Sequence, residues 1–214
     1  MNEINYPNPR KHPFKPVFNE KSRVLILGSF PPINTSEKDG FYYAAKNNVF
    51  WLILGTLFNG KDLSEKSMDE KRNFLLDKKI ALWDIWAYCY KKDPKSGSDG
   101  GIIADKSQPV DLTELFEVAK IQKIFTTIGG SETSKSPRGN NFKKWKIDKW
   151  LWEGVKYGEK KYGGYAKYFS HCKNISEMVT PLYSTSSRGI QTKRVTYEQI
   201  LNDYEKIKKA LEKQ

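Results

Sequence analysis

The sequence predicts an α/β fold, with three layers, α/β/α, around a mainly parallel four-stranded central sheet. Four apolar runs, at residues 23–29, 80–85, 123–128 and 178–183, are typical of strands buried on both faces. Helical patterns separate these runs, and such alternation is typical of parallel sheets. Glycine, proline or polar residues follow each run, and ligands of such sheets bind beyond the carboxyl ends of the strands. We therefore expect one composite site at that edge.

The helices expected between the strands differ in polarity. The first begins near Asn48 and is apolar nearly all round as far as residue 58, which predicts deep burial. A polar helix is expected near residues 68–77. Two capping boxes, at residues 111–114 and 196–199, predict where a shorter helix and the last helix begin.

A chain of 214 residues is long enough for one domain with a sizeable core. Residues 1–21 hold four prolines among scattered apolar residues, which predicts an extended N-terminal arm ahead of a single domain at residues 22–214. An insertion is expected at about residues 135–162, where nine basic and three acidic residues are interleaved with aromatic side chains. This insertion is interpreted either as a DNA-binding flap or as a surface subdomain with its own tryptophan cluster.

The charge balance indicates a polyanionic partner. The chain has 37 lysines and arginines against 25 acidic residues, a net charge of +12, and 14% of its residues are aromatic. Cations neutralise phosphates while rings stack on bases, so the combination favours nucleic acid over a membrane surface. The alternative is a lysine-rich surface that is simply solvated.

The scarcity of cysteine and histidine excludes several classes of protein. Two cysteines, Cys89 and Cys172, make neither a disulfide framework nor an iron–sulfur site, and two histidines, His12 and His171, make no multi-histidine metal centre. We therefore expect no metal and no cofactor. The first residues lack the apolar stretch of a signal peptide, and no apolar run is long enough to cross a membrane. These features predict a soluble, cytoplasmic protein without a membrane partner, and we expect a monomer.

Four segments, in order along the chain, have the form of sequence motifs. They are residues 28–32 (Gly-Ser-Phe-Pro-Pro), 43–51 (Tyr-Ala-Ala-Lys-Asn-Asn-Val-Phe-Trp), 80–85 (Ile-Ala-Leu-Trp-Asp-Ile) with Gly-Ser-Asp at 97–99, and 181–187 (Pro-Leu-Tyr-Ser-Thr-Ser-Ser). Together they resemble motifs of the uracil-DNA glycosylase superfamily, with its mismatch-specific and hypoxanthine-type branch the most similar. The Asn-x-Phe-Trp and Ala-Leu-Trp-Asp pieces are the more specific ones, and the Gly-x-x-Pro turn and the Ser/Thr loop are the less specific.

The resemblance implies cleavage of the N-glycosidic bond of a deaminated or damaged base that is flipped out of DNA. By position, Tyr43 matches the aromatic residue that stacks on the base; the alternative is that the aromatic residues of this segment fill the core of an ordinary crossover. The last segment matches a loop that grips the DNA backbone through small hydroxyls and main-chain amides. That loop contains Ser184, Thr185, Ser186, Ser187 and Arg188.

The sequence departs from the family pattern where water is positioned. The third residue of the Gly-x-x-Pro motif is usually Asp or Asn, and here it is Phe30, which is expected to contact the base instead. The resemblance to the hypoxanthine-type branch implies that Asn48 positions the water. Asn47 is a near alternative for this role and is otherwise expected to contact the base. Asn48 also suits the cap of the following helix. Two further departures are Ala45-Lys46 in place of His-Pro and the lack of a histidine in the last loop.

Further candidates come from the ends of the other strands and from the insertion. Asp84 is a second candidate for orienting water, although such a carboxylate also caps loops or pairs with lysines. Thr127 is positioned to donate to the edge of a base, and its alternative role is that of an ordinary strand residue. The candidate phosphate contacts in the insertion are Lys143, Lys144 and Lys146.

The sequence leaves three functions to consider. The first is a monofunctional DNA glycosylase that acts on DNA containing a damaged or mismatched base. The second is a non-catalytic superfamily member that binds DNA or a base, which Phe30 favours. The third, a small nucleotide-binding enzyme, is disfavoured because the chain has neither a Gly-x-Gly-x-x-Gly motif nor a P-loop.

Overall fold

A computed structural model describes residues 9–32, 40–93, 99–128, 141–157, 159–192 and 194–213. Its central sheet has four strands in the order β3-β2-β6-β9, and every neighbouring pair is parallel. The predicted α/β fold with a four-stranded parallel sheet is therefore confirmed. The strands are β2 (Val24–Gly28), β3 (Ile80–Asp84), β6 (Lys123–Thr126) and β9 (Val179–Pro181).

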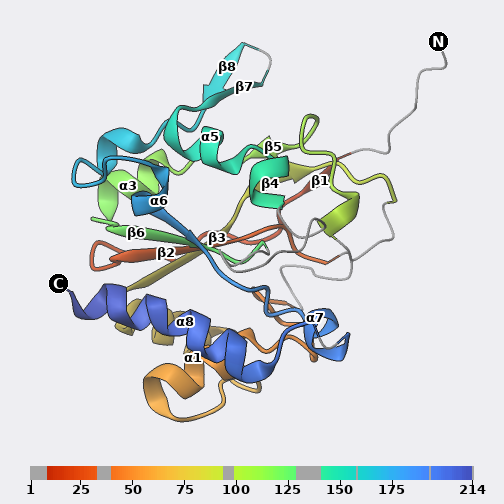
Figure 1. The fold of residues 1–214 in the computed structure, drawn as a ribbon, viewed down its shortest axis with the longest axis vertical. Helices are drawn as coiled ribbons and strands as arrows, with labels where there is room; N and C mark the ends of the chain where they lie inside the picture. Colours follow the sequence, from red (N-terminus) through yellow and green to blue (C-terminus); the bar gives the residue numbers. More distant parts are fainter. Residues whose placement is uncertain are drawn as a thin grey trace.

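Helices cover both faces of this sheet and complete the three layers (Figure 1). Each face has its own apolar cluster, and the strands supply both because successive side chains point to opposite faces. Leu25 and Leu27 of β2 belong to one cluster, whereas Val24 and Ile26 belong to the other. On one face lie α1 (Phe50–Asn59), α2 (Met68–Asp77) and α8 (Tyr197–Glu212); on the other lie α3 (Thr113–Val118), α5 (Ile147–Trp152) and α6 (Ile175–Met178).

A second, antiparallel sheet was not expected from the sequence. It has the order β1-β4-β5, and β4 follows β3 after a single residue. Its outer strands are only two residues long, too short to give a sequence pattern. The strands are β1 (Arg10–Lys11), β4 (Trp86–Cys89) and β5 (Gln108–Pro109).

The described part of the predicted arm, residues 9–21, packs on the domain. β1 pairs with β4, and Val17 forms an antiparallel bridge with Leu82 at the edge of the central sheet. The side chain of Val17 is buried in the same cluster as α1 and α8. The arm is therefore part of the fold in this structure.

The positions of the helix ends agree with some of the sequence predictions and disagree with one. The α2 bounds match the expected residues, and α8 begins at the predicted capping box, in which Thr196 and Gln199 exchange hydrogen bonds. The capping box expected at residues 111–114 is wrong. Leu112 is the N-cap of α3, and the Asp111 carboxylate accepts hydrogen bonds from the amide and the hydroxyl of Thr113 instead.

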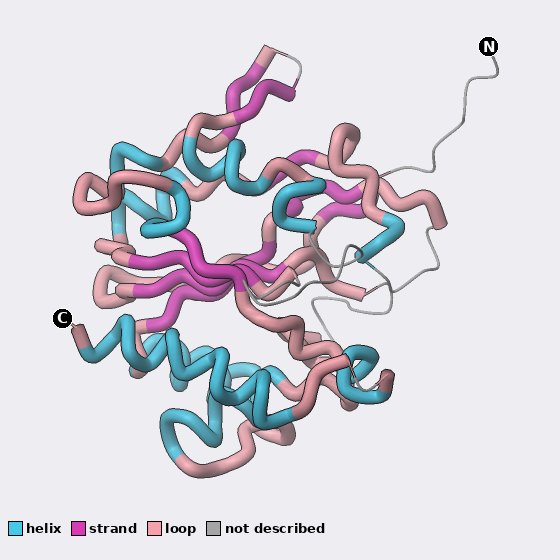
Figure 2. Tube along the Cα trace, viewed as in Figure 1, coloured by secondary structure: helices cyan, strands magenta, loops and turns pink. Residues whose placement is uncertain are grey.

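The described part of the insertion forms α4 (Asn141–Lys144), α5 and a hairpin of β7 (Val155–Tyr157) and β8 (Lys160–Tyr162). Its tryptophans do not form a separate cluster, because Trp145 packs edge-on against Trp86, with ring centroids 5.8 Å apart, and Trp150 is buried in the same core. The hairpin projects from the body (Figure 2). Gly163 directly follows β8 and has φ +83°. A Cβ atom there would lie 1.9 Å from the carbonyl oxygen of Trp150, so glycine is required at this position.

The remaining short helices are the 3-10 turns η1 (Asp99–Gly101) and η2 (Ala166–Tyr168) and the helix α7 (Ser187–Gln191). Within the described ranges, each helix is too short or too polar to cross a membrane.

Candidate functional site

Side chains converge on Gly28, the last residue of β2. A Cβ atom on Gly28 would lie 2.1 Å from Oδ1 of Asp84 and 2.7 Å from the hydroxyl oxygen of Tyr43. Asp84 ends β3, and Tyr43 precedes α1, so three segments meet at one point. Glycine is therefore required at this strand end because the two polar side chains occupy the space of a side chain. This convergence lies at the carboxyl edge of the sheet, where the composite site was expected.

Asp84 is held by a residue of the N-terminal arm. Nε2–H of His12 donates to Oδ2 of Asp84 at 3.0 Å, and the two side chains are only 5% and 7% exposed. Nδ1 of His12 lies within hydrogen-bonding distance of the main chain of Phe14. The imidazole therefore fixes one carboxylate oxygen, while the other faces Gly28.

Tyr43 and Thr127 are joined across the site. The two hydroxyl oxygens lie 2.8 Å apart, and the Tyr43 ring stacks on Phe50 with centroids 3.9 Å apart and planes 14° apart. Tyr43 has φ +56°, an unfavourable backbone conformation for a tyrosine, which these contacts hold in place. Burial, followed by the charge of Asp84, raises the pKa of Tyr43 well above its ordinary value, so the phenol keeps its proton. One ring face is covered by Phe50, and stacking of a base on the other face stays a prediction.

Asn48 lies at the start of α1, and its Oδ1 accepts a hydrogen bond of 3.0 Å from the amide of Phe50. Val49 is the residue assigned to the N-cap position, yet the side chain of Asn48 is the one that bonds to the first turn. Asn48 is half-buried, whereas Asn47 is exposed. The structural role expected for Asn48 is thus present, and its role towards water stays a prediction.

Phe30 lies beneath the arm. It is 5% exposed, with the guanidinium carbon of Arg10 5.2 Å from its ring centroid and the His12 ring edge-on at 5.7 Å. Arg10 also donates to the carbonyl oxygens of Pro31 and Pro32, which ties the arm to the turn after β2. Contact between Phe30 and a base would therefore require the arm to move, and the base-binding role of Phe30 stays a prediction.

A hydrogen bond next to this site, between Ser29 and Asp99, was not predicted from the sequence. The Ser29 hydroxyl, in the turn after β2, donates to the carboxyl group of Asp99 at the start of η1. Burial, with a smaller effect of the Asp84 charge, raises the pKa of Asp99 to about 6; the Ser29 hydrogen bond and the charge of Lys91 oppose this rise. The available signal was the Gly-Ser-Asp match at residues 97–99, which does not reveal its partner.

The Ser/Thr loop after β9 is tied to the start of α1. The amide of Val49 donates to the carbonyl oxygen of Thr185 at 3.1 Å. Thr185 is only 1% exposed, so contact between its hydroxyl and DNA would require this loop to move, and that role stays a prediction. Ser184 is half-buried and Ser186 is exposed, and both remain candidates for phosphate contacts. The side chains of Ser187 and Arg188 lie outside the described residues.

The predicted lysine contacts are on the surface of the insertion. Lys143 and Lys144 of α4 and Lys146, which precedes α5, are all exposed. Lys146 has φ +53° and lies between the two short helices. Exposure is compatible with phosphate binding but does not by itself test it.

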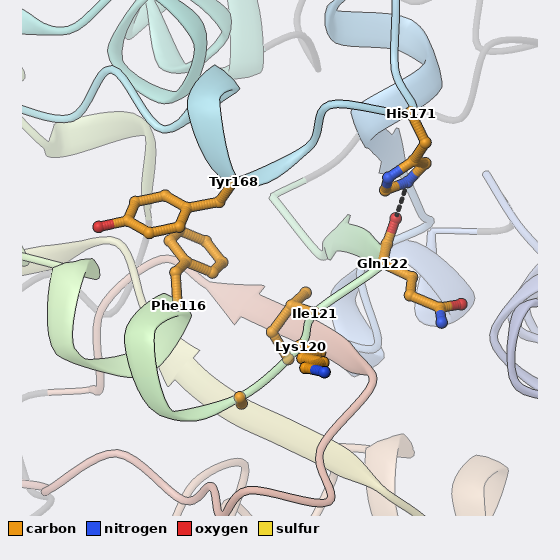
Figure 3. A pocket seen from close by; sticks show the side chains of 7 residues that line it. Phe116, Lys120, Ile121, Gln122, Tyr168 and His171 are labelled. Atoms are coloured by element: carbon orange, nitrogen blue, oxygen red, sulfur yellow. Dashed lines mark hydrogen bonds between the residues drawn. The ribbon is translucent and has the colours of Figure 1, made fainter.

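A pocket of about 270 Å³ lies at the opposite edge of the sheet, next to the residues that precede β6 (Figure 3). Nε2–H of His171 donates there to the carbonyl oxygen of Gln122 at 3.1 Å. The pocket contains none of the residues that converge on Gly28. In the part of the chain that the structure describes, no group of three or more His, Cys, Asp and Glu side chains is suited to bind a metal ion. The pocket is lined by Phe116, Ala119, Lys120, Ile121, Gln122, Tyr168 and His171.

Comparison with known proteins supports the resemblance found in the motifs. The chain is 33% identical over 97 residues to a hypoxanthine DNA glycosylase of Methanosarcina barkeri and 31% identical over 96 residues to one of Methanosarcina acetivorans. Each alignment covers 45% of this chain, and the chain spans 58% and 57% of the length of these relatives. No family model matches the chain.

A solved structure shares the fold. The solution NMR structure of a Methanosarcina acetivorans protein, named provisionally as a uracil DNA glycosylase, aligns with a TM-score of 0.58 and 19% identity. The alignment covers 94% of this chain and 98% of the other. The resemblance to the uracil-DNA glycosylase superfamily, with its hypoxanthine-type branch, is thereby confirmed in sequence and in fold.

Proposed function

We propose that this protein is a monofunctional DNA glycosylase that hydrolyses the N-glycosidic bond of a deaminated or damaged base. The convergence of Asp84, Tyr43 and Thr127 at Gly28, at the edge of the sheet where α/β proteins bind ligands, is the observation that carries this proposal. The names of the curated relatives favour hypoxanthine, and the name of the structural neighbour favours uracil.

The geometry suits the charge that develops in this reaction. When the bond to the base breaks, the sugar acquires positive charge as an oxocarbenium-like ion, which a nearby carboxylate stabilises. Asp84 presents one oxygen to the site while His12 holds the other, so the carboxylate is oriented before the substrate binds. Asn48 is the residue to which we assign the orientation of the attacking water, and its hydrogen bond to the amide of Phe50 at the start of α1, which holds its side chain, supports this assignment.

Recognition of the base and of the DNA uses separate groups. The Tyr43 ring supplies a platform for a flipped base, since its plane is fixed by stacking on Phe50. Half-buried Ser184, exposed Ser186 and the exposed lysines of the insertion are the groups to which we assign contacts with phosphates. The net charge of +12 supports a DNA partner.

A non-catalytic protein that binds DNA or a base is the second candidate. It is favoured by Phe30, which stands where the family usually has a water-positioning Asp or Asn and which the arm covers. Such a protein would bind the same DNA without opening the glycosidic bond.

One experiment separates the two functions. Labelled duplexes that contain uracil, hypoxanthine, xanthine or a mismatch are incubated with the protein, treated with alkali and resolved by size, with an undamaged duplex as control. Cleavage at the damaged position alone, together with binding that weakens steeply as salt rises, is the expected result. Salt-dependent binding without cleavage of any duplex would favour the non-catalytic function, and neither binding nor cleavage would contradict both.

A further inference from the structure

The first described residues of the N-terminal arm lie across two side chains of the candidate site. The guanidinium carbon of Arg10 is 5.2 Å from the ring centroid of Phe30, and the guanidinium also donates to two main-chain oxygens of the turn after β2. His12 donates from Nε2 to Asp84 at 3.0 Å. Phe30 and Asp84 are each only 5% exposed. A flipped nucleotide therefore cannot pack against the covered sides of these residues while residues 9–12 keep this position.

Residues 9–12 are attached to the domain by contacts that can open locally. β1 is only two residues long and pairs with β4, and the amide of His12 donates to the carbonyl oxygen of Ala87 at 2.8 Å. No side chain of residues 9–12 belongs to either apolar cluster of the core. Segments with few buried apolar contacts open at a lower free energy than the core does.

The chain is anchored firmly a few residues further on. The hydroxyl of Tyr42 donates to the carbonyl oxygen of Lys15 at 2.9 Å. Val17 is only 1% exposed and exchanges two main-chain hydrogen bonds, of 2.9 and 2.8 Å, with Leu82. The change from a loosely to a firmly attached chain therefore falls just after residues 9–12, so this segment can move while the rest of the arm stays in place.

From this contrast we infer that residues 9–12 form a lid, which opens to admit a flipped nucleotide and closes over it before the glycosidic bond breaks. This role rests on the proposed glycosylase function. Closure returns His12 to Asp84, so the carboxylate oxygen that faces Gly28 regains its orientation. Lids of this kind exclude water and complete the catalytic site in other enzymes. His12 is then a positioning residue, because it acts on the sugar only through Asp84.

Hydrogen exchange measures the opening without any substrate. The amides of His12 and Val17 each donate to the carbonyl oxygen of a strand residue, at 2.8 and 2.9 Å, so the two bonds are closely matched. A lid predicts that the His12 amide exchanges at least about 100-fold faster than the Val17 amide, because opening of residues 9–12 releases only the first. Equal protection of the two amides would overturn the inference.

A disulfide between β1 and β4 can lock the lid. Lys11 and Tyr88 lie directly opposite each other on these neighbouring strands (Figure 1), and both side chains are exposed. The Cα atoms of such pairs are about 4.5–5.5 Å apart, within the range that a disulfide spans. The double variant Lys11→Cys/Tyr88→Cys can therefore be locked by oxidation and released by dithiothreitol. Cys89 competes little, because burial raises its pKa to about 11 and leaves little thiolate at neutral pH.

Single-turnover excision, on whichever damaged duplex the wild-type protein cleaves, shows the effect of the lock. The oxidised double variant should excise at least about 100-fold more slowly than the same protein after reduction, because a locked lid admits no nucleotide. The single variants Lys11→Cys and Tyr88→Cys are the matched controls and should excise at the wild-type rate with or without oxidation. Equal rates for the oxidised and reduced double variant would overturn the inference, since the nucleotide would then reach the site beneath a closed lid.

Two substitutions of His12 test its positioning role. His12→Gln keeps an N–H donor for Asp84, whereas His12→Phe keeps a ring without a donor. His12→Phe should lower the maximal single-turnover rate by about 10- to 100-fold, with little change in the half-saturating protein concentration. His12→Gln should recover most of that rate. Equal rates for the two variants would overturn the positioning role, because a residue that only fills space gains nothing from a donor.

The outcomes separate the lid from the function on which it rests. If the wild-type protein excises no base from any duplex, the proposed function fails, and exchange of the His12 amide decides whether the segment opens. If the wild-type protein excises a base and the oxidised lock does not slow it, the lid alone is overturned. Should the double variant fail to fold or to form its disulfide, the comparison of the His12 and Val17 amides decides, and equal protection overturns the lid.

Discussion

At the carboxyl edge of the central sheet, polar side chains fill the space that a side chain on Gly28 would need, and a tyrosine is held with a positive φ. At the amino edge, by contrast, a pocket of about 270 Å³ is open, and its one histidine bonds to a main-chain carbonyl. No carboxylate lines the open pocket, whereas the Asp84 carboxylate lies at the crowded edge. The chemistry that we propose therefore lies where a strained backbone and buried polar side chains meet, and not beside the open pocket.

The largest expected effect comes from Asp84→Asn. The amide still accepts the hydrogen bond from His12 but cannot take a proton from water or stabilise the sugar cation. We expect the excision rate to fall by about 10²- to 10⁴-fold, measured in single turnover. His171→Ala, in the pocket at the other edge, is the matched control and should excise at the wild-type rate. If Asp84→Asn and His171→Ala lost the same fraction of the excision rate, the proposal that the chemistry lies at the carboxyl edge would be contradicted.

Gly28→Ala should affect both stability and activity. Its Cβ would lie 2.1 Å from Oδ1 of Asp84, so the strand end or the carboxylate has to move, at a cost of about 1–3 kcal/mol in the free energy of unfolding. Urea unfolding measures this change, and excision should fall in parallel. Gly101→Ala is the control, because its Cβ meets nothing within 4 Å. If the Gly28→Ala protein were as stable and as active as the Gly101→Ala protein, the side chains around Gly28 would not be as tightly packed as the structure indicates.

The smallest expected effect is a gain in stability from Asp99→Asn. Because the pKa of Asp99 is raised to about 6 in the folded protein, folding favours the protonated form, and stability is lost as pH rises from about 4 through 6. The asparagine variant avoids this loss. It should unfold with about 1–3 kcal/mol more free energy at pH 7.5, after allowance for partial exposure, and match the wild type near pH 4.

Melting curves at the two pH values measure the difference. A variant less stable than the wild type at pH 7.5 would mean that the Asp99 carboxylate stabilises the fold. In that case the ionised Asp99 side chain would not lower the free energy of unfolding, and this part of the molecule would resemble an ordinary surface.

The central sheet was predictable because its strands are buried on both faces. Residues 23–29 are apolar without interruption, and the structure places Val24–Gly28 between β3 and β6. The second sheet was not predictable, because a strand of two residues, such as β1, exists only through its partner. The capping box at residues 111–114 failed for a related reason: Asp111 satisfied its hydrogen bonds within the turn before the helix.

The candidate site was predictable where it follows the strands and unpredictable where it depends on distant partners. Tyr43, Asp84 and Thr127 were selected from their places near strand ends, and the structure brings them together. The partner of Asp84 is 72 residues away in the sequence, at His12, and the Ser29–Asp99 contact spans a similar distance. No periodic pattern records such contacts, since each depends on how the arm and η1 fold back over the sheet.

The path of the arm determines how the protein can be attached to a surface. Arg10 and His12 lie directly over Phe30 and Asp84, so a bulky fusion placed just before them would crowd the site. The chain leaves α8 at the other end of the sheet, far from α7 (Figure 1). Immobilisation through the C-terminal end of α8 would therefore present the carboxyl edge of the sheet outward to a dissolved oligonucleotide.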